Sequence, residues 1–516
     1  MANTTFKTYT NEHGGRVIIL ILLFLLAIYQ FIHAGFPAFA TICLSPLFVV
    51  AVILGFRSKL LVFWVLIIVN ATLQNKNIHY PGPMSLYNEI IEILLLVLAL
   101  LDIKHSRFER TGNVMLFTLM IWCGYCTLQV LNDTCSLGMD IEAWYTGARL
   151  MAFQLMYAFL VFSIYISKPE VLIKYLYIWG ALSLFAAFWV WKQKNIGFTD
   201  AENSFIQGRG RATHILYGGT LIRYFSTYSD AANFGIGIAC TAVAFIIFGI
   251  TQRIWKYRLF FLIVGIACTW AMFPSGTRTG TICLLAGLIT YIFLSKSVKI
   301  AIPFTIIFGF LAFILVFTKI GDGNQSIHRM RTAFDKNDAS ANARTLNQEA
   351  MKKYMQEAPF GIGIAQGYGS VPANNKYAFM STVPADSEYV YIWIRTGVVG
   401  ITLFIICTAI MFIGACIVIL FRLKSPSLRG IGAGMCCAFV SFQLGGYGNQ
   451  VLMQFPNCVQ FYGGLTIVYV LPFFEKEWIA YETKIITEQK EKKRLRLEKI
   501  EKMRIKPWYS WIYKYL

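Results

Sequence analysis

The strongest constraint on this chain is a series of long apolar runs that recur along nearly its whole length. A helix needs roughly 20 predominantly apolar residues to cross the hydrocarbon core of a bilayer, and about fourteen runs are candidates for such a span. They lie near residues 17–34, 36–55, 60–73, 86–103, 113–131, 147–166, 171–191, 234–250, 258–273, 279–295, 300–318, 392–421, 428–444 and 453–474. Because the runs are continuous rather than alternating, they predict helices and not a membrane β-barrel. We therefore expect an all-α polytopic membrane protein with about 12–14 transmembrane helices.

Composition and charge narrow the class further. With 57% hydrophobic and 14% charged residues, the chain is not a soluble globular protein. The net charge of +20 would suit nucleic-acid binding, but the basic residues gather in alternate loops, and loops between them, such as 132–146, are poor in Lys and Arg. This is the positive-inside pattern. It predicts both termini in the cytoplasm, contact with membrane lipids and no nucleic-acid partner.

The pattern divides the chain into five expected regions, with a large exterior loop before the last three spans. They are a transmembrane scaffold (1–191), a transmembrane region with arginine-bearing exterior loops (192–318), the large loop (319–391), the C-terminal transmembrane helices (392–474) and a basic cytoplasmic tail (475–516). The tail is expected either to lie against anionic lipid or to be a solvated charged helix. In the scaffold, Glu89, Glu92 and Arg149 favour an interfacial position or an intramembrane ion pair.

The large loop is far longer than an ordinary connection and has structured segments of its own. Residues 339–358 have the composition of an amphipathic helix, which Pro359 would end. The glycine-rich run Pro359–Gly369 lacks a preceding strand and a Gly-Lys-Ser/Thr ending, so it does not predict a nucleotide site.

Arginines on the exterior side break the positive-inside rule and indicate an anionic ligand, because a guanidinium can bind phosphate oxygens in a bidentate way. Arg209, Arg211 and Arg223 lie in one exterior segment, before an N-cap signature at Asp230. Arg278 lies at the start of the next helix, where its charge is unfavourable unless an anion binds there. The alternative is that Arg278 reaches lipid headgroups.

Two further arginines are substrate-binding candidates. Arg344 lies in the large loop, and Arg395 lies one turn into the following span. A charge at the position of Arg395 is costly unless it is paired. It could therefore join the anion site or neutralise Asp386 or Glu388.

The order of these features resembles the bacterial O-antigen ligase and O-antigen polymerase family of membrane glycosyltransferases over residues 220–405. The resemblance rests on Arg223 with the following FSTYSDAANFG, on the SGTRTG turn around Arg278, and on motifs of the large loop. Those loop motifs are Ala343-Arg-Thr, Pro359-Phe-Gly-Ile-Gly, Asp386-Ser-Glu-Tyr and Thr396-Gly-Val-Val-Gly.

The resemblance implies a multi-pass enzyme of the bacterial inner membrane that polymerises or ligates surface polysaccharide of the O-antigen or capsule type. The donor would be an undecaprenyl-diphosphate-linked glycan, whose diphosphate Arg223 and Arg278 would hold. The acceptor would be a glycan or a lipid A core at the periplasmic face. The resemblance implies no metal or other cofactor, and it allows a chain-length regulator protein as a partner. The alternative is a polysaccharide or lipid-linked oligosaccharide exporter, which should place charged groups along a path through the membrane.

The chain departs from the family pattern at one catalytic position. Family ligases have a histidine where this chain has Asp386. A carboxylate can accept the proton of an attacking hydroxyl, so Asp386 is the candidate base and Glu388 its rival. The alternative is that both residues cap the helix that begins near Tyr389.

Overall fold

The computed structural model describes residues 57–80, 83–216, 219, 221–295, 339–384 and 387–504, with single residues within 22–29 and 302–318. The chain divides into two compact units, residues 1–64 and 65–516. Of the first unit little is described beyond the start of one helix, so the following concerns the second.

The second unit is built from helices, as the apolar runs predict. In the described part of the chain, 8 helical segments are long and apolar enough to cross a membrane. The first four segments are α5 (Val114–Leu128) with η2 (Gln129–Leu131); α6 (Ile141–Ala148) with η3 (Arg149–Phe153) and α7 (Gln154–Tyr165); α8 (Pro169–Asn195); and α11 (Ala231–Thr251). The other four are α12 (Trp255–Met272) with η5 (Phe273–Ser275); α18 (Glu388–Ile417) with η7 (Val418–Arg422); α19 (Pro426–Gly448); and α20 (Asn457–Val470) with η8 (Leu471–Phe474) and part of α21 (Glu475–Arg504).

Shorter helices account for three more of the expected runs. They are α3 (Lys59–Thr72), α4 (Ser85–Leu101) and α13 (Arg278–Leu294). The polytopic, all-helical fold is thus confirmed. The runs expected near 17–34, 36–55 and 300–318 fall almost wholly outside the described residues.

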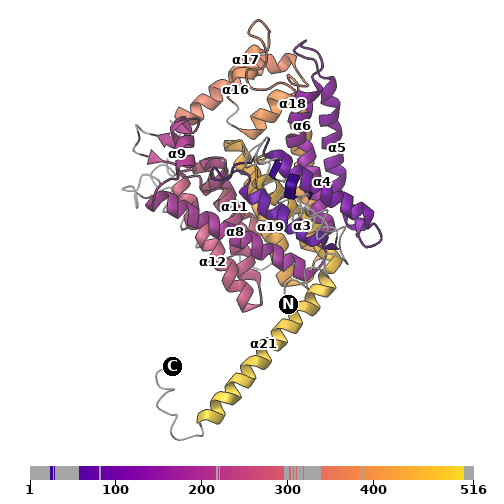
Figure 1. The fold of residues 1–516 in the computed structure, drawn as a ribbon, viewed down its shortest axis with the longest axis vertical. Helices are drawn as coiled ribbons and strands as arrows, with labels where there is room; N and C mark the ends of the chain where they lie inside the picture. Colours follow the sequence, from indigo (N-terminus) through magenta and orange to yellow (C-terminus); the bar gives the residue numbers. More distant parts are fainter. Residues whose placement is uncertain are drawn as a thin grey trace. The chain divides into compact units, whose positions relative to one another are not determined.

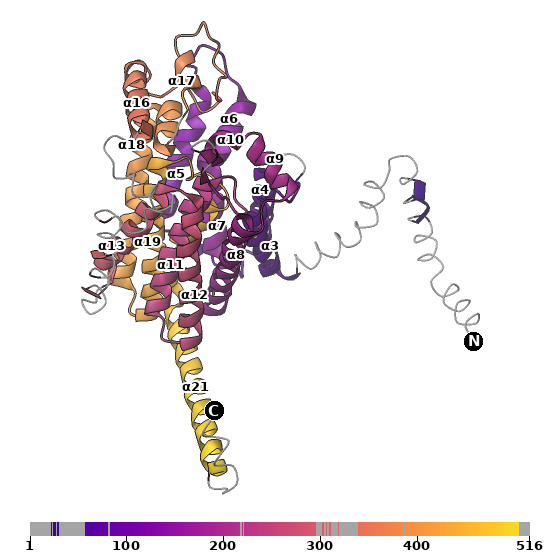
Figure 2. The same ribbon diagram turned by 90° about the vertical axis from the view of Figure 1, so that its left-hand side faces the viewer.

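The remaining elements are short and lie mostly at one end of the long helices. They are η1 (Phe108–Thr111), α9 (Asp200–Gln207), α10 (Arg211–His214), α16 (Ala339–Glu357), α17 (Ala378–Thr382), and an antiparallel pair of two-residue strands, β1 (Ile215–Leu216) and β2 (Leu221–Ile222). Figures 1 and 2 show α9, α16 and α17 near one end of the unit and α21 at the other. The charge pattern of the loops predicts that the first end is the exterior one, and we refer to it by that name.

Helix α11 forms the centre of the exterior half and packs against α12, α13 and α19. Small residues let these helices approach closely, as is common where lipid removes the usual hydrophobic drive for association. A Cβ added at Gly280 of α13 would lie 2.9 Å from the carbonyl oxygen of Gly235 in α11. This contact brings the exterior ends of α11 and α13 together.

The polar groups of the scaffold pair with one another. Arg149 Nη1 lies 3.4 Å from Glu89 Oε2, and both side chains are buried. Tyr145 donates a hydrogen bond to the same carboxylate at 2.8 Å, and Gln154 donates to Glu92 at 2.6 Å. A buried ion pair, one of the two arrangements expected from the sequence, is therefore present.

The C-terminal helix α21 is anchored at its start and exposed further on. Trp478 is fully buried and donates to Ser427 at 3.0 Å, and Glu475 accepts the backbone N–H groups of Lys424 and Ser425. Residues 487–498 are exposed on every side of the helix, which extends away from the other helices in Figure 1.

The Arg149–Glu89 pair generates a stability prediction. Removing one partner of a buried pair leaves an uncompensated charge, so Arg149→Leu should lower the free energy of unfolding by about 3–5 kcal/mol. Adding Glu89→Gln should restore part of that loss. Thermal unfolding of the detergent-purified protein measures both, with Arg107→Leu, a substitution at an exposed position, as the control. An unchanged Tm in Arg149→Leu would contradict the role of the pair.

Candidate functional site

The exterior end of α11 is a capped helix start, as the sequence predicts. The Asp230 carboxylate accepts the backbone N–H groups of Ala232 and Asn233 at 2.8 and 2.9 Å. The cap places the preceding residues 221–229 across the exterior end of α11. Arg223 belongs to this segment.

Arg223 joins that segment to the turn before α13. Its guanidinium donates to the carbonyl oxygens of Ser275 at 3.2 Å and Thr213 at 2.9 Å, and to Thr277 Oγ1 at 3.0 Å. The backbone N–H of Tyr224 adds a bond to the Pro274 carbonyl. Two loops separated by some fifty residues of chain are thus locked together, and Arg223 comes to lie beside the residue that precedes Arg278.

Arg278 is the first residue of α13 and is half-buried. Thr277, at the N-cap position, makes no side-chain cap, because its hydroxyl instead donates to the Ala231 carbonyl at 2.7 Å. The first turn of α13 therefore has a cationic side chain and no side-chain cap. A helix start of this kind suits an anion.

Lys76 is a residue of this site that the sequence reasoning missed. Its ammonium nitrogen lies 4.3 Å from the centroid of the Phe205 ring. Burial lowers its pKa, and the neighbouring Asp230 carboxylate raises it in part. The signal was in the sequence, because Lys76 is a cation in a short exterior loop where the positive-inside rule disfavours one.

The loop that carries Lys76 is fixed by the asparagines on either side. Asn75 accepts the backbone N–H of Asn77 at 3.0 Å, and Asn77 donates to the buried Glu202 carboxylate at 3.2 Å. Burial would raise the pKa of Glu202, but hydrogen bonds from Thr199, Trp189, Gln193 and Asn77 outweigh it and hold the pKa below its ordinary value. An ionised Glu202 therefore anchors the loop against α9. We call Lys76, Arg223 and Arg278 the cation cluster.

His214 connects the parts of the cation cluster. It is almost fully buried, and its Nε2 accepts the backbone N–H of Ala231 at 3.1 Å. Its ring meets the Phe205 ring edge-on at 5.3 Å, and its carbonyl accepts the N–H of Arg223. Burial is the main cause that lowers its pKa to about 4. Neutral His214 is therefore a structural residue of the site.

The connection between α19 and α20, residues 449–456, ties the cation cluster to α18. Its hydrogen bonds run from Asn449 Nδ2 to Thr279 Oγ1 (3.0 Å), from Ser229 Oγ to Gln454 Oε1 (2.7 Å), from Asn233 Nδ2 to the Phe455 carbonyl (2.8 Å), and from the Leu452 N–H to Glu388 Oε2 (2.9 Å). The starts of α11, α13 and α18 therefore meet around one short segment.

The carboxylate of Glu388 accepts a hydrogen bond from the connection between α19 and α20. The side chain is buried and bonds Leu452 rather than an N–H of its own helix. Ser387, at the N-cap position of α18, bonds the Gly446 carbonyl and caps nothing with its side chain. The capping alternative for Glu388 is therefore wrong. Asp386 lies outside the described residues.

The glycine-rich run of the large loop bonds the backbone of α18 where that helix is interrupted. Gly397 has φ 70° and ψ −171°, which interrupts the helix. The carbonyls freed at Ile394 and Arg395 accept the N–H groups of Ile362 and Gly363 at 2.9 and 3.1 Å, and Tyr125 donates to the Thr396 carbonyl at 2.7 Å. Backbone groups at membrane depth must be satisfied in this way. The run is thus a backbone clamp on α18.

The other candidate arginines are not part of the cation cluster as defined above. Arg209 and Arg211 are exposed near α10. Arg344 is in α16, and its side chain is among those not described. Arg395 donates to the Ile364 carbonyl at 2.8 Å, packs on Tyr391, and lines a cavity under the large loop together with Gln450.

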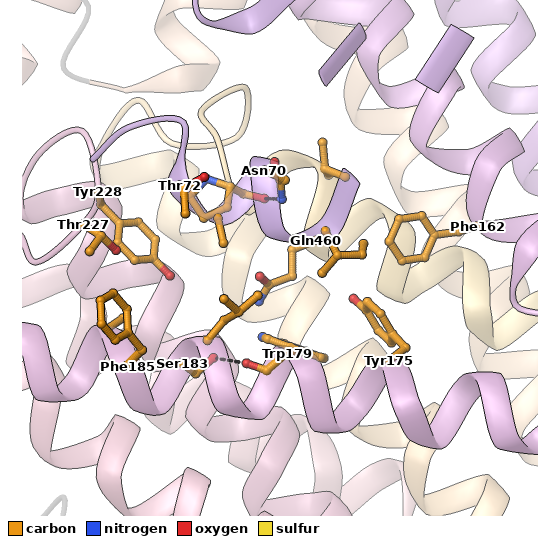
Figure 3. Close-up of a pocket in the computed structure, with 16 residues that line it drawn as sticks. Asn70, Thr72, Phe162, Tyr175, Trp179, Ser183, Phe185, Thr227, Tyr228 and Gln460 are labelled. Carbon is orange, nitrogen blue, oxygen red and sulfur yellow. Dashed lines mark hydrogen bonds between the residues drawn. The ribbon is translucent and has the colours of Figure 1, made fainter. Parts of the chain in front are cut away.

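A separate small cavity lies between α3, α8 and α20 (Figure 3). Asn70, Ser183 and Gln460 line it, amid aromatic side chains such as Trp179. Its volume of about 40 Å³ holds a few water molecules at most. The cavity is therefore too small to receive a sugar. Within the described ranges, no group of three or more His, Cys, Asp or Glu side chains could hold a metal ion.

Residues 264–405 match the family model of the O-antigen ligase domain. The family expected from the sequence is confirmed over this range, which runs from α12 into α18. It contains Arg278, Arg344 and Arg395 as well as Asp386 and Glu388. No curated protein matches the chain.

His214 makes the stability of the site depend on pH. Its pKa of about 4 lies below the ordinary 6.5, so the folded state binds the proton more weakly than the unfolded state does. The stabilisation of the folded state by neutral His214 is complete above pH 6.5 and is lost as the pH falls toward about 4. His214→Gln should flatten the change of Tm across this window, whereas the control His79→Gln should keep it. Equal slopes in the two variants would contradict this role.

Proposed function

We infer that this multi-pass membrane protein, which carries an O-antigen ligase family domain, is a membrane glycan transferase of the ligase or polymerase type. From this premise we propose that it transfers a glycan from an undecaprenyl-diphosphate donor to an acceptor hydroxyl at the periplasmic face. The product is a surface polysaccharide of the O-antigen or capsule type. Both chain termini lie in the cytoplasm, in keeping with the charge pattern of the loops.

The observation that carries the proposal is the contact between Arg223 and the turn that presents Arg278. Arg223 bonds Thr277 at 3.0 Å, and Arg278 follows at a helix start without a side-chain cap. Lys76 adds a third cation from a separate loop. Three cations from three loops beside a helix N-terminus form a binding site for a diphosphate.

The chemistry requires such a site because the leaving group gains charge. The oxygen of the acceptor hydroxyl attacks the anomeric carbon of the donor glycan. The bond from that carbon to the diphosphate oxygen breaks, and undecaprenyl diphosphate leaves with the electron pair. The proton of the hydroxyl passes to a base. Guanidinium groups fixed in place beforehand stabilise the growing negative charge with little reorganisation.

Asp386 is the proposed base. Glu388 is buried and its carboxylate holds the Leu452 N–H, which supports a positioning role for Glu388 rather than proton transfer. Asp386 precedes Glu388 by two residues in the sequence and stands in the motif where family ligases have a histidine.

The donor site is tested with Arg278→Ala. Loss of one group that stabilises the transition state should lower the rate of glycan transfer by about 10²–10³-fold. Lys76→Ala should also lower the rate of glycan transfer. Glycan transfer in membranes with equal protein levels measures both, with Lys194→Ala, an exposed cation at the end of α8, as the control. Glycan of wild-type length in Arg278→Ala would refute the site.

The base is tested by comparing Asp386→Asn with Glu388→Gln. Asp386→Asn should lower kcat by about 10²–10⁴-fold with little change in KM. Glu388→Gln should keep most of kcat, because the amide oxygen can still accept the Leu452 N–H. If Glu388→Gln lowered kcat more than Asp386→Asn did, Glu388 would be the base.

The glycan of a deletion strain separates the two reaction types. Single repeat units on the lipid A core identify a polymerase, and full chains that accumulate on the carrier lipid identify a ligase. A deletion strain with wild-type surface glycan would contradict the proposed function.

A further inference from the structure

The cavity under the large loop has the size of a ligand site. Its volume is about 450 Å³, within the range of roughly 300–1,000 Å³ that is usual for small-molecule sites. The large loop, the first turns of α18, and Gln450 of the connection before α20 line it. The loop residues include Tyr368, Ser381 and Pro384. Aromatic and aliphatic walls with a few polar groups are typical of sites that fix the orientation of a small ligand.

Arg395 gives this cavity a positive charge. Its guanidinium donates to the Ile364 carbonyl at 2.8 Å and lies 4.7 Å from the centroid of the Tyr391 ring. Among the described residues, no carboxylate lies within ion-pair distance of Arg395, and Glu388 bonds Leu452 instead. A largely enclosed guanidinium without a counter-ion is costly. An anionic ligand in the cavity would remove that cost.

The position of Arg395 is also fixed in advance. The carbonyls of Ile394 and Arg395 are held by the backbone clamp from Ile362 and Gly363, and the side chain is held by Ile364 and Tyr391. A side chain ordered before binding loses little conformational entropy when the ligand arrives. This geometry is that of a selective contact rather than of a mobile surface arginine.

The cavity adjoins the cation cluster but is distinct from it. Gln450 lines the cavity, and its neighbour Asn449 bonds Thr279, the residue after Arg278. Pro384 and Tyr391, on either side of Asp386 in the sequence, both line the cavity. A sugar bound here would lie next to the donor site proposed above.

We propose that this cavity is the acceptor subsite and that Arg395 selects a saccharide bearing an anionic group, either a carboxylate or a phosphate. The inference rests on the proposed glycan transfer and names the class of acceptor that the same site takes. The ring of the saccharide packs against Tyr368 and the apolar wall, Gln450 and Ser381 bond its hydroxyls, and Arg395 binds the oxyanion.

The test measures binding of three probes to the detergent-purified full-length protein, namely glucuronate, glucose 6-phosphate and glucose. At least one anionic probe should bind the wild type about tenfold or more tighter than glucose, as a charge-assisted hydrogen bond predicts. The better of the two anionic probes identifies the group. Equal affinity for all three probes would overturn the proposal, and this comparison requires no variant.

Two variants locate the selectivity. Arg395→Gln should bring the affinity of the anionic probe down to that of glucose, whereas Gln450→Ala should weaken all probes and keep the preference. The control Lys376→Met removes an exposed cation of the same loop that does not line the cavity, and it should change nothing. A preference that survives in Arg395→Gln would overturn the role of Arg395.

Binding of undecaprenyl diphosphate separates the two proposals. Arg395→Gln should leave this binding unchanged, and Arg278→Ala should abolish it without altering the sugar preference. If Arg278→Ala binds undecaprenyl diphosphate normally, the donor site of the proposed function fails, whatever the sugar probes show. If Arg395→Gln loses it, the cavity is not a separate subsite.

Discussion

The architecture around the site depends on the need to satisfy every backbone polar group near the membrane. Helix α18 breaks at Gly397, inside its candidate membrane span, and the freed carbonyls bond Ile362, Gly363 and Tyr125. These bonds bring the large loop down onto α18. The cavity lined by Arg395 exists because the loop is held there. One backbone irregularity thus determines where this cavity lies.

Electrostatics places the proposed chemistry at one end of the molecule. The scaffold neutralises its own charges through the Arg149–Glu89 pair, whereas the cation cluster gathers charge at the exterior ends of α11 and α13. Cations on the exterior side are disfavoured by the positive-inside rule. Arg223 also has a structural role there, because it bonds Ser275, Thr213 and Thr277. The position of the three cations on that side supports the anionic substrate proposed above.

The membrane helices could be predicted from the sequence because the length of an apolar run is a local property. The Asp230 cap was predictable for the same reason. Lys76 was missed because one lysine in an exterior loop is a weak signal by itself, and its place in the site arises from Phe205 and Asp230, which lie far away in the chain. The bond from Leu452 to Glu388 and the break at Gly397 are tertiary features. A Gly-x-x-Gly run within an apolar helix gives no local sign of a clamp.

The clamp has a consequence for how such proteins can diversify. The stretch from Ile364 to Asp386 leaves α18 near Arg395 and returns to it at Ser387, so both of its ends are anchored on one helix. Lengthening or replacing an arc of this kind costs little in loop-closure entropy. It would also leave the cation cluster untouched. Under the acceptor role proposed above, replacing this arc would change the saccharide that the protein accepts and leave its use of the lipid carrier as it is.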